Sequence, residues 1–431
     1  MRSITLCFIL IYLLALGLSA QEEYTFDLSE IEKKAFQLGG YLEFRPVLFG
    51  LDRDSWLYKL RFYDHEEGET ISEYNFNALL DLSFEKGIVG AKIRTNTDIT
   101  KSVSGWSHVT TLFEAFLSLK PSLSFHLDIG KKRMKWGKGY AWNPVAFIDR
   151  PKNPNDPGLA LEGYVVLSID YIKSFQGKLK TITLTSVLIP VNEHINSTFG
   201  NKNRLNFGGK VYFLFYDTDI DLMFLSGGSG PARYGMDFSR NITSNFEIHG
   251  EFAYIPDYIK KVIQEDGAVG EEQYASINYL LGIRFLTETN TTFFFEYFKN
   301  GNGYTSNEME NFYFLIDQAY QSYLLAGDDS QLEFLSGAAG QAYRTFAPMQ
   351  DYLFLRISQK EPWNIPYFIP SFTSIFNLTD KSFSLTPELL YNPITNLELR
   401  AKITILLGKG GSEFGEKQND FRLEFRGRYY F

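Results

Sequence analysis

The chain has 431 residues, a formal net charge of −9 and an aromatic content of 16%, led by 39 Phe and 27 Tyr. The acidic balance argues against a nucleic-acid-binding protein, which needs a basic surface. No linker rich in Pro, Gly or Ser divides the chain, so we do not expect the two or three soluble domains that its length would otherwise suggest.

The N-terminus has the order of a secretory signal peptide, which we place at residues 1–20. Arg2 supplies the positive charge, residues 4–18 are almost wholly apolar, and Ser19-Ala20 provides small residues at the cleavage site. An uncleaved anchor is the alternative, but the apolar stretch is shorter than the about 20 residues of a membrane helix. The only cysteine, Cys7, lies in this segment, so the mature chain would have no disulfide and no cysteine metal site.

Alternation of apolar and polar residues dominates the rest of the chain. In the final segment one face carries Phe421, Leu423, Phe425, Gly427, Tyr429 and Phe431, and the other carries Arg422, Glu424, Arg426, Arg428 and Tyr430. This period of two is typical of a strand with one apolar and one wet face. We count about 18 or 19 such segments, among them 36–49, 54–63 and 419–431, and single-chain bacterial barrels have even strand numbers.

These strands predict an all-β protein in which residues 21–431 form a transmembrane antiparallel up-and-down β-barrel of about 18 strands, with 16 to 20 open. A soluble β-sandwich alternates as well. However, the segments are commonly about 10 to 14 residues long, as in tilted membrane strands. Tight turns such as Gln176-Gly177 also alternate with long loops, as periplasmic turns alternate with outer loops.

The chain ends on Phe431, at the end of an alternating strand. A terminal aromatic residue in this position resembles the assembly signal of Gram-negative outer-membrane barrels of the porin-like kind. The resemblance implies a location in the bacterial outer membrane, with membrane lipid and the outer-membrane barrel assembly machinery as partners.

A first long loop is predicted near residues 138–160, after a basic segment. Four prolines between residues 144 and 157 prevent regular structure, and two glycines precede them. We expect the loop to fold inward as a constriction narrowed by basic side chains, although a surface loop is equally compatible with the pattern. The four basic residues of this predicted constriction are Arg133, Lys135, Lys138 and Arg150.

The same window resembles porin-like proteins of the alginate-export type. In those proteins a basic strand ending in Trp-Gly, here Trp136-Gly137, leads into an irregular loop with Asn-Pro, here Asn143-Pro144. The arginine pairs of the alginate-export proteins are not matched here, so the resemblance does not imply polymer export.

A second long loop is predicted near residues 299–348, and it contains two helices. The residues that recur at helical spacing in the first helix are Phe312, Leu315, Ile316, Ala319, Tyr320 and Tyr323. Asp328-Asp329-Ser330 would cap a second short helix that runs to Leu335. The helices could form a lid or plug over the barrel mouth, or they could pack on a neighbouring loop.

The wet faces of the strands carry many charges, which a membrane protein tolerates only where they face water or one another. Our candidates for solute selectivity in the lumen are Arg94, Arg422, Arg426 and Arg428. Arginine rows would attract anionic solutes. Acids are interleaved with these arginines, so a ladder of ion pairs that stabilises the wall is the alternative.

We therefore expect a channel for passive diffusion of small hydrophilic solutes, with the arginines favouring anionic ones. The alternative is a barrel sealed by its loops that binds or assembles surface polysaccharide or a partner protein. Enzymatic activity is not expected, because no Gly-x-Ser-x-Gly elbow occurs. No cofactor or metal is expected either, because the sequence has neither a phosphate-binding loop nor metal-ligand spacing.

Overall fold

The structure is a computed structural model, and it describes residues 35–265, 267–338, 343 and 345–431. The predicted signal peptide at residues 1–20 lies outside the described residues. Contacts divide the chain into residues 1–36 and residues 37–431, and the barrel described below belongs to the second unit.

Eighteen strands form one sheet. The first nine are β1 (Phe36–Leu51), β2 (Thr70–Lys86), β3 (Val89–Ser102), β4 (Gly105–Ser122), β5 (Phe125–Lys132), β6 (Tyr164–Ser174), β7 (Leu179–Val191), β8 (Arg204–Phe215) and β9 (Thr218–Leu225). The others are β10 (Arg233–Thr243), β11 (Phe246–Ile263), β12 (Val269–Leu286), β13 (Thr291–Lys299), β14 (Asp351–Gln359), β15 (Phe368–Asn377), β16 (Ser382–Ile394), β17 (Leu397–Leu407) and β18 (Asn419–Tyr430).

Consecutive strands are neighbours in the sheet, and β1 also pairs with β18, which closes the barrel. The closing pair is antiparallel, with Tyr41 opposite Tyr430 and Val47 opposite Glu424. Closure leaves no strand edge unpaired, as a sheet inside a lipid bilayer requires. The predicted all-β transmembrane barrel of 18 strands is confirmed.

The alternation along β18 separates a lipid face from a lumenal face. Phe425 points outward and is 47% exposed, whereas the next residue, Arg426, points inward and is only 1% exposed. Phe421, Leu423 and Tyr429 are also exposed. An apolar exterior of this kind is stable only against lipid, because a large exposed apolar surface is unfavourable in water.

The predicted strand at residues 54–63 is wrong, because this segment forms the helix α2 (Trp56–Phe62). The side chain of Ser55 caps the helix by accepting a hydrogen bond from the Tyr58 backbone N–H at 3.2 Å. Buried Tyr58, Leu60 and Phe62 alternate in sequence like a strand face. A serine N-cap was the signal that favoured the helix.

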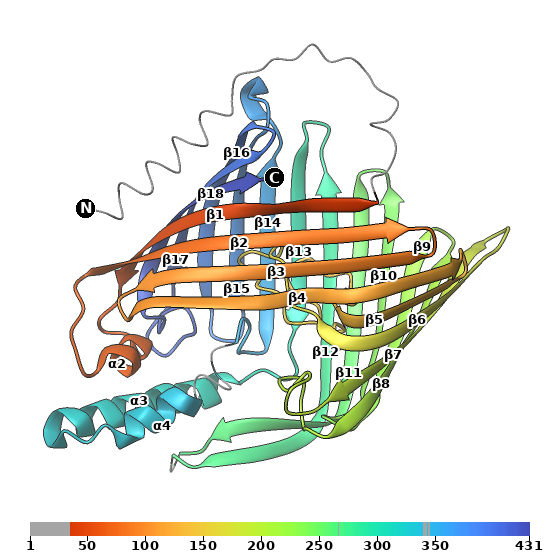
Figure 1. Cartoon of the computed structure of the whole chain (residues 1–431). Coiled ribbons are helices and arrows are strands. Elements are labelled where there is room, and N and C mark those ends of the chain that lie inside the picture. The colour runs from red at the N-terminus through yellow and green to blue at the C-terminus, as the bar shows by residue number, and fades with distance from the viewer. Residues whose placement is uncertain (1–34, 266, 339–342, 344) are drawn as a thin grey trace. The chain divides into compact units, whose positions relative to one another are not determined.

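The connections at the two rims differ in length. At one rim the connections are short, such as 87–88, 216–217 and 395–396. The opposite rim carries the long loops 133–163 and 300–350, together with α2. Figure 1 shows α2, α3 (Ser306–Ala326) and α4 (Ser330–Ala338) gathered at one end of the barrel.

The helices α3 and α4 occupy the second long loop, where the spacing of apolar residues predicts helices. A capping box starts α3, in which Thr305 and Glu308 exchange hydrogen bonds, and Gly327 ends it in the left-handed conformation. The α3 helix packs on α2, where the Tyr63 and Tyr323 rings meet edge to face at 5.2 Å. A short 3₁₀ helix, η3 (Pro362–Asn364), lies between β14 and β15. No helix among the described residues is long and apolar enough to span a membrane.

Candidate functional site

The loop at residues 133–163, which we call the constriction loop, packs against the inner face of the barrel. It is somewhat longer than the predicted segment 138–160. Its apolar residues form one buried cluster with inward-facing strand residues. The loop contributes Trp136, Val145, Phe147 and Ile148 to this cluster, and the strands contribute Val166, Val187, Ile189, Val191, Met223, Leu225 and Ala253. Burial of apolar surface therefore holds one side of the loop against strands β6 to β11.

Polar contacts with β11 fix the middle of the loop. The Glu251 carboxylate accepts hydrogen bonds from the backbone N–H groups of Lys138 and Gly139, both at 2.6 Å, and of Val145 at 3.2 Å. The side-chain amide of Asn143 donates a fourth hydrogen bond, at 2.9 Å. Charged acceptors make stronger hydrogen bonds than neutral ones, so Glu251 is a strong anchor for an otherwise irregular segment.

Strand β13 supplies a second anchor. The Glu296 carboxylate accepts hydrogen bonds from the backbone N–H groups of Tyr140 and Ala141, at 2.5 and 2.8 Å. The His249 ring also contacts Glu296, with 2.9 Å between Nε2 and Oε1. Glu251 and Glu296 are both buried, so bulk water cannot readily replace these hydrogen bonds.

Two glycines make this close approach possible. Gly137 has a φ of +95°, and a Cβ atom there would lie 2.6 Å from the Asn143 side chain. At Gly139 a Cβ atom would lie 2.1 Å from the Trp142 carbonyl oxygen. Side chains are therefore excluded where the loop backbone meets the Glu251 carboxylate.

The four basic residues predicted for the constriction have different environments. Lys138 reaches the wall, with its Nζ 3.0 Å from the Asp221 carboxylate. Arg150 pairs with Glu162 at 3.1 Å, and Arg133 Nε lies 3.8 Å from Asp149. Lys135 is exposed and makes no ion pair within the described part of the chain. Three of the four thus contact acids that fix the loop, and Lys135 alone presents an unneutralised charge.

The constriction loop also reaches strands β17 and β18. The Asp156 carboxylate accepts a hydrogen bond from the Arg426 guanidinium at 2.6 Å and lies 3.5 Å from Arg400. Burial alone would raise the pKa of Asp156, but Arg426, Arg400 and Lys402 lower it to about 2. Because Glu251 and Asp156 bind different walls, the loop extends across the lumen.

The inner face of strands β14, β17, β18, β1 and β3 forms a wall that we call the basic wall. Its nine cations are Arg45, Lys92, Arg94, Arg356, Arg400, Lys402, Arg422, Arg426 and Arg428. They share seven acids, which are Glu43, Asp81, Glu114, Asp156, Glu388, Glu398 and Glu424. The predicted residues Arg94, Arg422, Arg426 and Arg428 all belong to this wall.

Sharing of acids is most pronounced around β18. Glu424 lies within 4 Å of Arg45, Lys402, Arg422 and Arg426. Arg45 and Arg426 also pair with Glu43, and Arg426 pairs with Asp156 as well. The ion pairs expected as the alternative therefore exist, and nine cations against seven acids leave a formal excess of two positive charges among these paired residues.

The sequence analysis missed the acids that hold the constriction loop. Glu251 lies on an alternating wet face, where it is indistinguishable from a solvated acid, and it is 106 residues or more from its loop partners. Asp156 lies among the loop prolines and gives no local indication of its partners in β17 and β18. Only the abundance of acids among the lumenal cations hinted at anchors of this kind.

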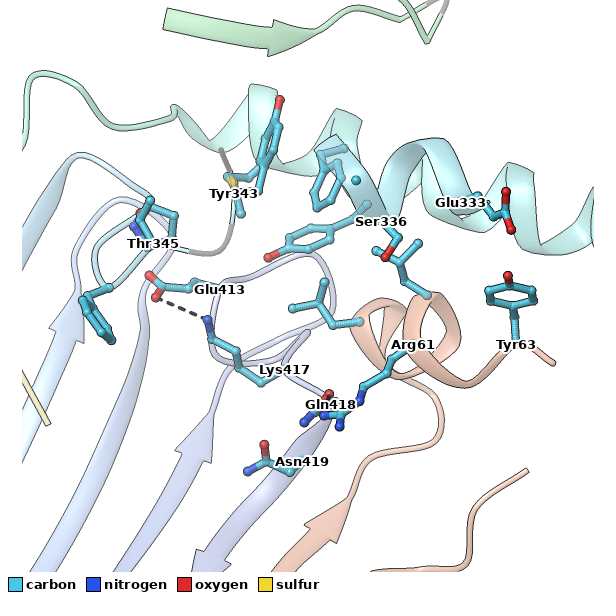
Figure 2. A pocket seen from close by; sticks show the side chains of 18 residues that line it. Arg61, Tyr63, Glu333, Ser336, Tyr343, Thr345, Glu413, Lys417, Gln418 and Asn419 are labelled. Atoms are coloured by element: carbon cyan, nitrogen blue, oxygen red, sulfur yellow. Dashed lines mark hydrogen bonds and ion pairs between the residues drawn. The ribbon is translucent and has the colours of Figure 1, made fainter. Parts of the chain in front are cut away.

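Three cavities lie near the long-loop rim. The cap cavity, of about 770 Å³, lies between α2, α3, α4 and the loop before β18, where Lys417 and Glu413 face each other (Figure 2). The loop cavity, of about 520 Å³, is lined by Trp142 and Lys152. The wall cavity, of about 180 Å³, is lined by residues that include Arg422. No group of His, Cys, Asp and Glu suited to a metal ion occurs among the described residues.

No protein-family model and no curated protein sequence matches this chain. Solved structures do match its fold. OccAB1 of Acinetobacter baumannii has a TM-score of 0.55 at 8% sequence identity, over 92% of this chain and 97% of that chain. OpdQ of Pseudomonas aeruginosa has a TM-score of 0.52 at 10% identity, over 92% and 98%. The outer membrane protein OpdK of Pseudomonas aeruginosa has a TM-score of 0.50 at 10% identity, over 92% and 99%.

These structures lend no support to the resemblance to alginate-export proteins. At such low sequence identity they show the fold alone. The chain shares the closed antiparallel barrel of outer-membrane porins.

Proposed function

We propose that this protein is a channel of the bacterial outer membrane for passive diffusion of small hydrophilic solutes, with a preference for anions. An apolar exterior, a charged lumen and a loop folded across that lumen are what a solute channel needs. The proposed channel requires no catalytic residue and no cofactor.

The observation that carries the anionic preference is the position of the constriction loop. The loop binds the wall that bears the acids Asp221, Glu251 and Glu296, and its own N–H groups and Lys138 contact their carboxylates. The basic wall faces the loop, and among the ion pairs of the described residues Asp156 is the one loop acid that contacts its cations. On this proposal the loop covers these carboxylates with hydrogen bonds and with the charge of Lys138, so that the basic wall is the charged surface that a solute meets.

Planar-bilayer recording of the purified, folded protein tests this function. We expect stable single-channel steps and, under a KCl gradient, a reversal potential that corresponds to faster passage of Cl⁻ than of K⁺. A cation-selective channel would contradict the anionic preference. A silent bilayer, with folding verified by heat-modifiable electrophoretic mobility, would contradict the channel itself.

A second candidate function is a loop-sealed envelope barrel that binds surface polysaccharide or a partner protein. The observation that favours it is the group of α2, α3 and α4 at the long-loop rim. The same recording distinguishes the two functions, because a sealed barrel passes no current.

We also propose that Phe431 serves as an assembly signal for the outer-membrane barrel assembly machinery. Its backbone completes the barrel seam, donating to Gly40 O at 3.2 Å and accepting from Gly40 N at 3.1 Å, while its ring is 49% exposed. We expect Phe431→Ala to reduce the amount of heat-modifiable barrel in outer-membrane fractions severalfold. Phe425→Ala removes a similarly exposed outward aromatic of the adjoining strand β18, and this control should assemble normally. Equal yields of both variants would contradict the signal role.

A further inference from the structure

The segment at residues 345–348, which we call the strap, lies between α4 and β14, where the three cavities meet. Thr345 and Phe346 line the cap cavity, the loop cavity and the wall cavity alike. Pro348 lines the cap and loop cavities. The strap therefore separates the space under the helices from the two spaces beside the constriction loop and the basic wall.

Hydrogen bonds hold the strap backbone in place. The side-chain amide of Asn300, just after β13, donates to the Ala347 carbonyl oxygen at 2.9 Å and to that of Met349 at 3.2 Å. The Tyr304 backbone N–H donates to the Pro348 carbonyl oxygen at 2.8 Å. The strap thus has a fixed position beside the constriction loop, with which it lines the loop cavity.

The side chain of Phe346 is less restrained than this backbone. It is 50% exposed, and among the described residues its ring makes no aromatic or cation–π contact. Staggered rotamers of a half-exposed ring interconvert rapidly. A large apolar ring can therefore obstruct or clear the boundary between the cavities without any movement of the backbone.

The two cavities that meet at Phe346 share part of their lining. The cap cavity is lined by apolar residues of α2 and α3 such as Leu57 and Met309, and Glu413 and Lys417 line both this cavity and the wall cavity. The wall cavity brings together Asn155 of the constriction loop and Arg422 of the basic wall. A solute that passes from the cap cavity to the wall cavity leaves a surface that is partly apolar and partly charged, and it then meets the basic wall.

We propose that Phe346 is a gate residue that sets the size limit for solutes passing from the cap cavity into the lumen. This inference rests on the proposed channel function. A hydrophobic constriction retards hydrated solutes because they must shed water to pass an apolar ring. The rate of passage should therefore be reduced most for bulky hydrophilic solutes.

Proteoliposome swelling with neutral mono-, di- and trisaccharides tests the gate independently of charge. We expect Phe346→Ala to raise the swelling rate, and the rise should increase with saccharide size to severalfold for the trisaccharide. Phe334→Ala is the matched control, because Phe334 lies on α4, is 47% exposed and lines none of the three cavities. Its swelling rates should equal those of the unmodified protein.

A thiol-modification experiment provides a second measurement in case the alanine variant folds poorly. With Cys7→Ser as background, a methanethiosulfonate reagent should reduce the current through Phe346→Cys and leave that through Phe334→Cys unchanged. If the unmodified protein conducts but both positions behave alike in both assays, the gate is refuted and the channel stands. If the unmodified protein neither conducts nor supports swelling, the channel function itself is refuted.

Discussion

Replacing Glu251 and Glu296 together with alanine is expected to raise the single-channel conductance severalfold and to make the current noisier. The double variant removes the acceptors of six hydrogen bonds, four at Glu251 and two from the loop at Glu296. Each buried N–H left without a partner costs about 1–3 kcal/mol. The constriction loop should therefore leave the β11–β13 wall. The sheet itself should stay an intact cylinder, because the backbone hydrogen bonds between its strands are unchanged.

Glu247→Ala is the matched control for this experiment. Glu247 lies on the same face of β11 and contacts Ser239, His249 and Arg284, but no residue of the constriction loop. Its conductance should match that of the unmodified protein. If the double variant also conducts normally, in small steady steps, then apolar burial of Trp136 and its neighbours holds the loop without the carboxylates, and the anchors assigned to Glu251 and Glu296 are wrong.

Much of the barrel could be predicted because membrane strands are governed by a local rule. Each inward residue faces water and each outward residue faces lipid, so alternation in sequence directly reports the two faces. The rule failed at 54–63, where Tyr58, Leu60 and Phe62 are buried for a different reason. They are the buried residues of the short helix α2 at the rim, where no lipid face imposes a period of two.

The candidate site was less predictable because its contacts are not local. The irregular backbone, the prolines and the glycines of the constriction loop are visible in the sequence, and so are its basic residues. Which wall the loop binds depends on pairs such as Glu251 with Lys138 and Asp156 with Arg426, and the latter are 270 positions apart in the chain. The sequence analysis therefore assigned the basic residues to solute selection, while most of them contact acids that fix the loop.

The second large effect is expected on ion selectivity, at the contact between Asp156 and Arg426. A single substitution can remove either the negative or the positive charge of this pair. Asp156→Asn should make the channel more anion-selective, since Arg426 and Arg400 lose a shared counter-charge. Arg426→Gln breaks the same contact and should shift the reversal potential in the opposite direction. Asp328→Asn, which removes an acid between α3 and α4 that contacts Ser330, is the control and should leave the reversal potential unchanged.

Both variants break the same contact of the loop, so loop displacement alone should shift the reversal potential in the same direction in both. Opposite shifts would therefore show that charge determines the selectivity. Shifts of the same sign would mean that loop displacement dominates, and the role of the basic wall would then be refuted.

The pH dependence of selectivity gives a further check on the role of Asp156. The pKa of Asp156 is lowered from 3.8 to about 2, so its ionised form stabilises the fold by about 2 kcal/mol. This contribution is complete above pH 3.8 and is lost as the pH falls through about 2, so the contribution of Asp156 to selectivity should hold from neutral pH down to about pH 4 and fail only in stronger acid.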